Sequence, residues 1–149
     1  MALSKLDSLY KTVISEHSKS PRHRGSLVGV EKIELHNPTC GDIIELSVQI
    51  EDGKITDIAF DGVGCTISTA SASMMTEAVL GKELSVVKEL AIVFSKMVQG
   101  QEDSRQKNLG DASLLAGVAK FPQRIKCATL SWNALNKAIE RHVCSGTDM

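Results

Sequence analysis

The 149-residue chain has few aromatic side chains and no long apolar run. Phe, Trp and Tyr together make up 3% of the residues, so stacking on nucleic-acid bases is not expected. The net charge of −1 does not favour a polyanionic partner. The apolar run Leu90–Phe94 is far too short to span a bilayer, and the residues after Met1 lack the apolar core of a signal peptide. We therefore expect a cytoplasmic protein without nucleic-acid or membrane partners.

The chain contains four cysteines but no C-x-x-C pair. In a reducing compartment, four cysteines favour metal ligands or reactive thiols over a disulfide framework. Gly62-Val63-Gly64 is not a nucleotide loop, because no Gly-Lys-Ser/Thr follows it. The length and the hydrophobic content of 42% suit a single domain over residues 1–149.

A helix is expected within residues 1–20, because apolar side chains recur there at helical spacing and Pro21 interrupts the pattern. Its end overlaps a basic, polar connector, His17–Gly25. This connector is expected to be either a solvated loop or a docking surface for a partner, and the sequence leaves both interpretations open.

Three short strands are expected next. Apolar and polar residues alternate over 43–51, which is typical of a strand with one buried and one wet face. Asp52-Gly53 is a strong hairpin signal leading into a strand over 54–61, and residues 31–36 supply a shorter first strand. The sequence thus predicts a small three-stranded antiparallel sheet.

Helices are expected after the strands, which gives an α+β domain with helices packed on one face of the sheet. The first of them begins at Cys65 and ends near Gly81. Residues 100–110 form a highly polar insertion that we expect to be exposed and mobile, and Asp111 is expected to cap a short helix after it. Pro122 precedes the last helix.

Cys65 follows a glycine turn and stands at a predicted helix start. Gly62 and Gly64 permit the sharp turn. At a helix N-terminus, free N–H groups and the helix dipole favour a thiolate over a thiol. A small buried cysteine in a tight turn is the alternative, and the positions of the other cysteines bear on the choice.

Two further cysteines fall at the ends of expected elements. Cys40 lies in a turn between strands with Asp42 two residues on, and Cys127 is expected to open the last helix as Cys65 opens its own. Three sulfurs at about 2.3 Å and one carboxylate oxygen satisfy tetrahedral Zn²⁺, and the same set suits one iron–sulfur cluster. Because the gaps along the chain are long, three independent structural cysteines remain the alternative.

Cys144 and the histidines are expected to lie apart from this site. Cys144 stands near the C-terminal end and is interpreted as a stray surface thiol. The histidines have no partner at metal-ligand spacing and are interpreted as surface or capping residues. They are His17, His23, His36 and His142.

Three motifs in register resemble the U-type iron–sulfur cluster assembly proteins: NPTCGD (Asn37–Asp42), GVGCTISTASASMM (Gly62–Met75) and RIKCATLSW (Arg124–Trp132). The resemblance covers nearly the whole chain and is closest to the zinc-binding SufU branch. It implies a SufE/IscU-like α+β fold. The ligand set that it implies is Cys40, Asp42, Cys65 and Cys127, with Zn²⁺ as the ion.

Three features separate the chain from the IscU branch. Lys126 stands where IscU-type scaffolds carry a histidine, and Lys120–Arg124 replaces their chaperone-recognition stretch. The polar segment Gly100–Asn108, with part of the helix before it, resembles the insertion that marks the SufU branch. These departures disfavour chaperone-assisted cluster delivery and favour zinc.

The resemblance implies a zinc-dependent sulfurtransferase that acts with a pyridoxal-phosphate-dependent cysteine desulfurase of the SufS type. Cys40 is expected to accept the persulfide sulfur for downstream cluster-assembly proteins, because it sits on a turn beside Gly41 and can swing out. The resemblance also implies that a desulfurase histidine fills the position that Cys40 vacates.

Two alternatives stay open for the same residues. One is a scaffold that assembles and transfers a [2Fe–2S] cluster on the three cysteines and Asp42. The other is a purely structural zinc site. Arg124 and Lys126 are expected either to offset the negative charge of the site or to be solvated charges at a helix start.

Overall fold

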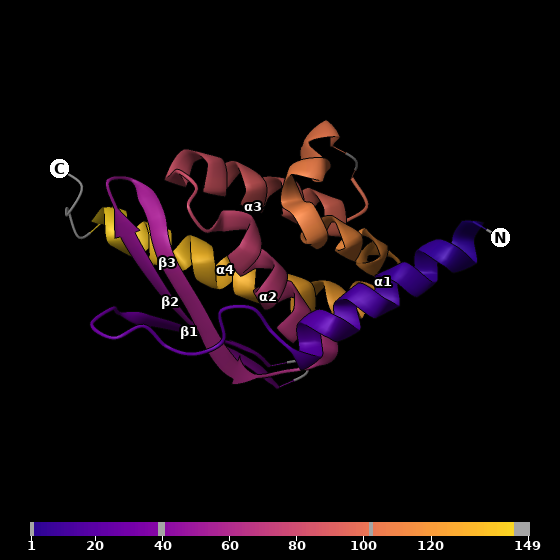
Figure 1. The fold of residues 1–149 in the computed structure, drawn as a ribbon, viewed down its shortest axis with the longest axis horizontal. Helices are drawn as coiled ribbons and strands as arrows, with labels where there is room; N and C mark the ends of the chain where they lie inside the picture. Colours follow the sequence, from indigo (N-terminus) through magenta and orange to yellow (C-terminus); the bar gives the residue numbers. More distant parts are fainter. Residues whose placement is uncertain (1, 39–40, 102, 145–149) are drawn as a thin grey trace.

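The computed structural model describes the backbone of residues 2–38, 41–101 and 103–144, and the side chains of residues 11–38, 41–101 and 103–142. One helix comes first, three strands follow, and the remaining helices come last (Figure 1). This order confirms the predicted α+β class. The elements are α1 (Ala2–Lys19), β1 (Lys32–Asn37), β2 (Asp42–Glu51), β3 (Lys54–Val63), α2 (Thr66–Val79), α3 (Leu84–Val98), the 3-10 helix η1 (Ser104–Lys120) and α4 (Pro122–Cys144).

The sheet is antiparallel with the strand order β1-β2-β3, as predicted. The turn between β2 and β3 is made by Asp52 and Gly53, whose φ angles are 53° and 74°. Two residues with positive φ are what a tight hairpin turn of matching twist requires, so the Asp-Gly pair sets Glu51 opposite Lys54. An irregularity between Gln49 and Ile50 shifts the register of the rest of the ladder.

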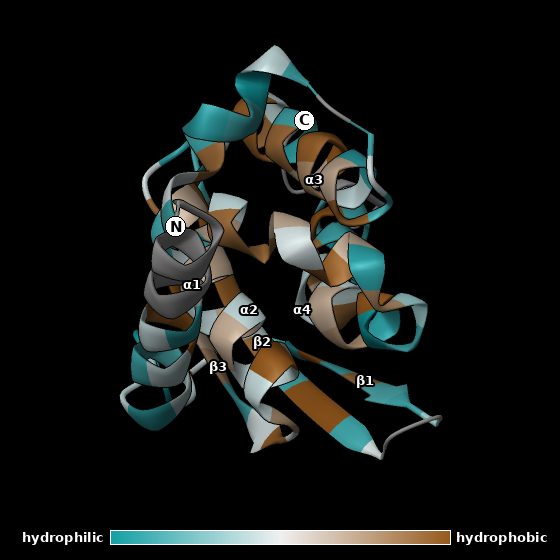
Figure 2. Cartoon of the chain, turned by 90° about the vertical axis from the view of Figure 1, so that its right-hand side faces the viewer, coloured by the Kyte–Doolittle hydropathy of each residue, from teal (hydrophilic) through white to brown (hydrophobic). Residues whose placement is uncertain are grey.

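The helices cover one face of the sheet. Helix α4 packs against β1 and β2, and α2 packs against β3. In Figure 2 the sheet lies beneath these helices with α1 beside them. The core between the layers is built from apolar side chains of both, among them Leu46, Ile58, Phe60, Met74, Phe94, Trp132 and Leu135.

Helix α2 begins and ends where the sequence predicts. Cys65 is its N-cap residue with an extended backbone, and its side chain accepts the backbone N–H of Ser68. At the other end Leu80 is the C-cap, and Gly81 follows with a φ of 80°. Glycine adopts this left-handed conformation without the steric cost of a β-carbon, which ends the helix cleanly.

Helix α4 begins earlier than the sequence suggests. Its first residue is Pro122, so Cys127 lies in the second turn and the prediction that Cys127 opens the helix is wrong. Proline is favoured at the first helical position, because its missing N–H would have no partner there and its fixed φ suits a helix. Cys127 is therefore held by a regular helical backbone on both sides.

Much of the polar insertion has regular structure. Asp103 caps η1 in a capping box with Gln106, and its carboxylate accepts N–H groups from the backbone and guanidinium of Arg105. Arg105 also donates to Glu89 of α3 at 2.8 Å. The helix kinks at Gly110, whose φ is 61°. Mobility of residues 100–110 stays a prediction.

The connector after α1 lies along β3. Gly25 donates its N–H to the carbonyl of Phe60 at 2.8 Å, and Phe60 donates its N–H to the carbonyl of His23 at 3.0 Å. Arg22 donates its backbone N–H to Ser73 Oγ on α2. The connector is thus fixed to both the sheet and a helix, and a freely solvated loop does not describe it.

His17 is buried, so its interpretation as a surface or capping residue is wrong. Its exposed fraction is 1%. Its Nδ1 lies 2.7 Å from Ser73 Oγ of α2, and its Nε2 lies 2.9 Å from Asp111 Oδ2 of η1. A buried imidazole needs partners for both nitrogens, and here two separate helices supply them.

None of the described helices combines the length and the apolar character that crossing a bilayer requires.

Candidate metal centre

Asp42, Cys65 and Cys127 converge in the structure. One ligand atom from each lies within 4.8 Å of the other two. Asp42 is the first residue of β2, Cys65 caps α2, and Cys127 lies in the second turn of α4. Cys40 lies outside the described residues, as does the side chain of Cys144.

The start of α2 is joined to Asp42. Cys65 donates its backbone N–H to Asp42 Oδ1 at 2.9 Å, and its sulfur lies 3.8 Å from Asp42 Oδ2. Ser68 donates its N–H to Cys65 Sγ at 3.4 Å. The Asp42 carboxylate and the helix N-terminus therefore position the Cys65 sulfur from two sides.

Gly64 makes this approach possible. A β-carbon at this position would lie 2.8 Å from Ser68 Oγ and 3.1 Å from Asp42 Oδ1. Contacts this short would displace the hydroxyl or the carboxylate. The glycine before Cys65 is thus required for close packing at the centre, in addition to the turn that the sequence predicts.

Cys127 is the deepest of the described donors. Its exposed fraction is 1%, and the side-chain amide of Asn37 donates to its sulfur at a nitrogen–sulfur distance of 3.8 Å. Asn37 is the last residue of β1 and pairs in register with Asp42. The end of the first hairpin strand thus contacts the buried sulfur directly.

Arg124 provides positive charge beside the sulfurs. The nearby Cys65 sulfur, together with that of Cys127, raises the pKa of Arg124 above its ordinary value, because negative charge on sulfur stabilises the guanidinium. Lys126, the other expected cation, is exposed. Of the two, Arg124 is the one that the structure places against the sulfurs.

The donors fit a metal centre. Two sulfurs and a carboxylate oxygen are ligand types that Zn²⁺ accepts, and thiolates are also the usual ligands of iron–sulfur clusters. Next to them Ser68 Oγ is buried without a hydrogen-bond partner in the part of the chain that the structure describes. A buried hydroxyl without a partner is uncommon in folded proteins. The Ser68 hydroxyl is therefore able to form a hydrogen bond with a group bound at the centre.

A cavity of about 460 Å³ adjoins the centre. Cys65, Ile67, Phe121 and Arg124 are among the residues that line it. Phe121 is 54% exposed, and Val63, two residues before Cys65, is 65% exposed. The surface at Cys65 therefore combines exposed apolar groups with a guanidinium.

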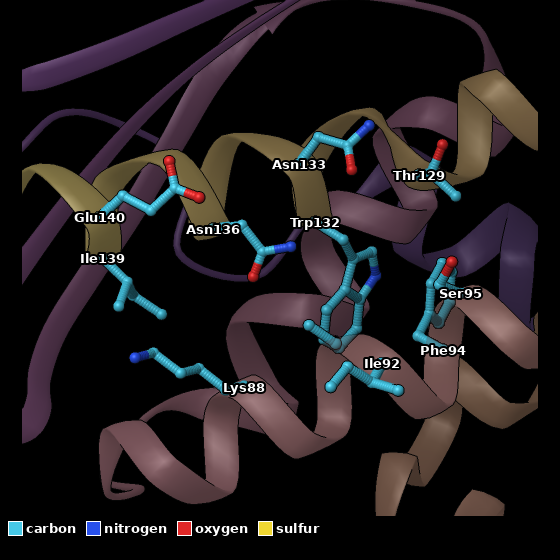
Figure 3. Close-up of a pocket in the computed structure, with 11 residues that line it drawn as sticks. Lys88, Ile92, Phe94, Ser95, Thr129, Trp132, Asn133, Asn136, Ile139 and Glu140 are labelled. Atoms are coloured by element: carbon cyan, nitrogen blue, oxygen red, sulfur yellow. The ribbon is translucent and has the colours of Figure 1, made fainter.

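Another cavity, of about 450 Å³, lies between α3 and α4 and contains none of the candidate ligands (Figure 3). The rings of Phe94 and Trp132 stack in its wall with their centroids 4.6 Å apart. Lys88 and Glu140 lie at the same end of this cavity in Figure 3. It is a groove between helices, separate from the sulfur-containing centre.

A second group of metal-binding side-chain types is explained by packing. His17, Glu77 and Asp111 place ligand atoms within 4.8 Å of one another. Both ring nitrogens of His17 already have hydrogen-bond partners, and the two carboxylates are about half exposed. This group joins three helices.

Sequence analysis alone missed the parts played by Asn37, Ser68 and the close packing at Gly64. Asn37 and Gly64 stand inside the motifs that contain the cysteines, but motif membership does not say which sulfur a side chain contacts. The Asn37–Cys127 pair is separated by 90 positions, so no local pattern reveals it.

Comparisons with known proteins show which family the chain is similar to. Residues 9–128 match the model of the NifU-like N terminal domain. The chain is 64% identical over 141 residues to the iron–sulfur cluster assembly scaffold protein IscU of Streptococcus pyogenes serotype M1, covering 95% of this chain and 89% of that one. It is 47% identical over 136 residues to the zinc-dependent sulfurtransferase SufU of Bacillus subtilis strain 168, covering 91% and 92%.

The fold is similar to solved structures as well. One is the crystal structure of a protein described as a candidate iron–sulfur cluster assembly scaffold for the SUF system of Fervidobacterium islandicum AW-1. The TM-score is 0.78 at 32% sequence identity, and the match covers 83% of this chain and 91% of the other.

Proposed function

The chain belongs to the family of NifU-like N-terminal domains, and on that premise we propose that it is an iron–sulfur cluster assembly protein that accepts sulfur at a zinc centre. The observation that carries this proposal is the convergence of Asp42, Cys65 and Cys127. Zinc is favoured because the sulfurtransferase that is 47% identical to this chain is named as zinc-dependent.

Cys40 completes the proposed ligand set. It falls in the loop between Asn37 and Asp42, two residues that pair in register at the end of the hairpin. The three other ligands would be Asp42, Cys65 and Cys127. When bound, zinc keeps its ligand thiols deprotonated at neutral pH.

The proposed reaction is a thiol exchange between two proteins. The Cys40 thiolate attacks the terminal sulfur of a persulfide carried by a cysteine desulfurase. A new S–S bond forms on Cys40, the S–S bond of the desulfurase breaks, and the desulfurase cysteine leaves as a thiolate. The terminal sulfur keeps its proton and its oxidation level, so the step needs no further oxidant or reductant.

The residues around the centre suit this exchange. Arg124 stabilises negative charge at the Cys65 and Cys127 sulfurs, and a guanidinium beside the centre would also favour a thiolate that departs there. Cys65 and Cys127 are each tied to a protein hydrogen-bond donor, Ser68 N–H and the Asn37 amide. Cys40, the remaining sulfur and the neighbour of Gly41, is the ligand that we propose leaves the metal.

Phe121 and Val63 suggest where the desulfurase docks. Both are exposed apolar groups near the centre, and Phe121 lines the cavity that includes Cys65. Apolar anchors of this kind are enriched at the centre of protein interfaces. The persulfide-bearing segment of the partner would enter beside Arg124.

A second candidate function is a scaffold that builds and passes on a [2Fe–2S] cluster with the same donors. It is favoured by the 64% identity to a protein named as an assembly scaffold. A carboxylate is a weaker cluster ligand than a thiolate, so Asp42 would make such a cluster easy to transfer.

The deciding experiment measures desulfurase turnover with zinc-loaded protein, metal-free protein and zinc-loaded Cys40→Ala. Cys144→Ala is the matched control, because it removes a thiol outside the proposed centre. Sulfur acceptance at Cys40 is supported if desulfurase turnover rises strongly with zinc-loaded wild type and zinc-loaded Cys144→Ala and with neither of the other two forms. No rise with any form, together with a stable cluster after reconstitution with iron and sulfide, favours the scaffold.

Thermal unfolding of Cys40→Ala and of a further variant, Cys127→Ala, addresses a purely structural zinc site. Such a site predicts that Cys40→Ala and Cys127→Ala lower the thermal unfolding temperature equally. Near-native stability of Cys40→Ala with loss of desulfurase stimulation excludes it.

A further inference from the structure

The two edges of the sheet differ in what covers them. The edge of β3 is covered by the connector, through the backbone bonds of Phe60 with His23 and Gly25. In the part of the chain that the structure describes, β1 pairs with β2 alone, and no other backbone group bonds to residues 32–36. In Figure 2, β1 lies at the side of the sheet away from α1. Its outer edge is therefore an open template on which a further strand can pair.

A row of carboxylates crosses the face of the sheet that is turned away from the helices. Glu34 of β1 lies directly opposite Glu45 of β2, which lies opposite Asp61 of β3. Like charges in directly opposite positions destabilise a sheet. Permanent cations offset two of the three, because Lys32 Nζ lies 3.6 Å from Glu45 Oε1 and Arg24 Nε lies 3.3 Å from Asp61 Oδ1.

Glu34 is the carboxylate of this row that has no permanent cation beside it among the described residues. Its Oε2 lies 3.1 Å from His36 Nε2, and an imidazole is a cation only when it is protonated. The side chain of Glu34 is 54% exposed, so a cation from another molecule can reach it.

We propose that the outer edge of β1 pairs antiparallel with the same edge of a second copy of this chain, centred on Ile33. This two-fold pairing sets Lys32 of each copy opposite Glu34 of the other, on the face that carries the carboxylates. Each Glu34 thereby gains a permanent cation. A pairing centred on Glu34 would instead set two glutamates opposite each other, so the charges select the register.

The helix-covered face of the sheet suits the same register. Leu35 is half-buried in the single chain and packs against the core. In the proposed dimer, Leu35 of the second copy falls opposite Glu31. A cavity of about 430 Å³ lies there, and Val30, Ile33 and Ala138 are among the residues that line it. The second copy would thus bring an apolar side chain to the mouth of this cavity.

The contact is short, because β1 has six residues. Interfaces below about 1,200 Å² are typical of weak association, so the dimer should form in a concentration-dependent way. The inference does not depend on the proposed function, and its tests involve neither the metal nor the desulfurase.

Sedimentation equilibrium of the full chain in reducing buffer tests the charge pairs. Lys32→Glu makes both pairs repulsive and should raise the dimer dissociation constant at least about tenfold. The double variant Lys32→Glu/Glu34→Lys exchanges the two charges without altering the net charge, so it should return the constant to within about threefold of wild type. Lys88→Glu is the matched control, because Lys88 is an exposed lysine of α3 and not of the sheet.

Zero-length cross-linking tests the register. Unlabelled and isotope-labelled protein are mixed and treated with a carbodiimide, which couples a lysine to a carboxylate that it contacts. Mass spectrometry of the digest should find Lys32 joined to Glu34 between a labelled and an unlabelled copy. The link between Lys32 and Glu45 within one copy is the internal control, because these side chains are already 3.6 Å apart.

A wild type that stays monomeric at every concentration would overturn the proposal. So would a dimer that Lys32→Glu leaves unchanged, or one that Lys32→Glu and Lys88→Glu weaken equally, because only net charge would then matter. Thermal unfolding of each variant checks its fold. If Lys32→Glu folds poorly, the double variant and the cross-link still decide: a double variant that stays monomeric, or a dimer without the Lys32–Glu34 link, rejects this interface.

Discussion

The backbone N–H of Cys65 donates to the carboxylate of Asp42 at 2.9 Å, across 23 positions of the chain. This bond joins the first residue of β2 to the cap of α2. The bond uses the backbone of Cys65 and only Oδ1 of Asp42, so it does not involve the Cys65 sulfur or Oδ2, the carboxylate oxygen nearer that sulfur. We therefore expect it to stabilise the protein with or without a bound metal.

Removal of this carboxylate should affect stability before any metal is added. Asp42→Ala leaves the Cys65 N–H without its acceptor, and the loss of one such partner costs about 1–3 kcal/mol. Urea unfolding of the metal-free variant measures the change. The control is Glu140→Ala, an exposed carboxylate of α4, which should stay within about 0.5 kcal/mol of wild type. An equal loss in both variants would contradict a specific role for Asp42.

Arg124 should control the reactivity of the sulfurs in the metal-free protein. A guanidinium favours negative charge on a neighbouring sulfur, so Arg124→Ala should slow alkylation of Cys65 and Cys127 several-fold at neutral pH. Lys126→Ala changes an equal charge two residues on in the same helix and should have the smaller effect. Alkylation rates for each cysteine check this, and equal effects of the two variants would show that only the overall charge matters.

The polar insertion should make the fold sensitive to acid. Hydrogen bonds from Arg105, first those of its guanidinium and then its backbone N–H, hold the pKa of Asp103 well below its usual value. Because this pKa is lower in the folded than in the unfolded protein, the unfolded protein binds more protons and stability falls as pH falls. The contribution of Asp103 should be complete above the ordinary aspartate pKa of about 3.9 and decline below it.

The comparison of wild type with Asp103→Asn tests this sign. The difference between their free energies of unfolding should be constant from neutral pH to about pH 5 and should shrink as pH drops below about 4. Chemical unfolding at several pH values measures it. A difference that grows in acid would contradict the assignment.

His17 should anchor α1 to the rest of the domain. His17→Leu removes the hydrogen bonds to Ser73 and Asp111, and it should lower the free energy of unfolding by about 1–3 kcal/mol. His36→Leu is the control, because His36 is exposed and contacts only the neighbouring Glu34 among the partners described here. A double-mutant cycle with Asp111→Ala should give a coupling of about 0.5 kcal/mol or more. Strict additivity would mean that the His17–Asp111 contact contributes nothing.

Local patterns were enough to predict the sheet and the start of α2. The Asp52-Gly53 turn and the alternation of the flanking strands are properties of neighbouring residues, and so is a cysteine cap after Gly64. The start of α4 at Pro122 was missed because proline reads equally well as a break before a helix and as its first residue.

The remaining misses involve contacts between distant parts of the chain. His17 finds its partners on α2 and η1, and Asn37 reaches a sulfur 90 positions away. A polar residue looks like a surface residue in the sequence until its partners are known. The grouping of Asp42 with the cysteines was predictable because carboxylate and thiol are ligand types, whereas the amide of Asn37 is not.

The centre draws its described donors from three separate parts of the chain, with Cys65 lying 23 residues after Asp42 and 62 residues before Cys127. An unfolded chain does not hold these groups together, so a metal that needs all of them binds only the folded protein. The amount of bound metal therefore depends on the fraction of protein molecules that is folded. Free metal at a hundred times its dissociation constant adds about 2.7 kcal/mol to stability. A core substitution anywhere in the domain should therefore weaken apparent metal affinity once it populates the unfolded state. The metal content of a cell extract would then report on folding throughout the chain.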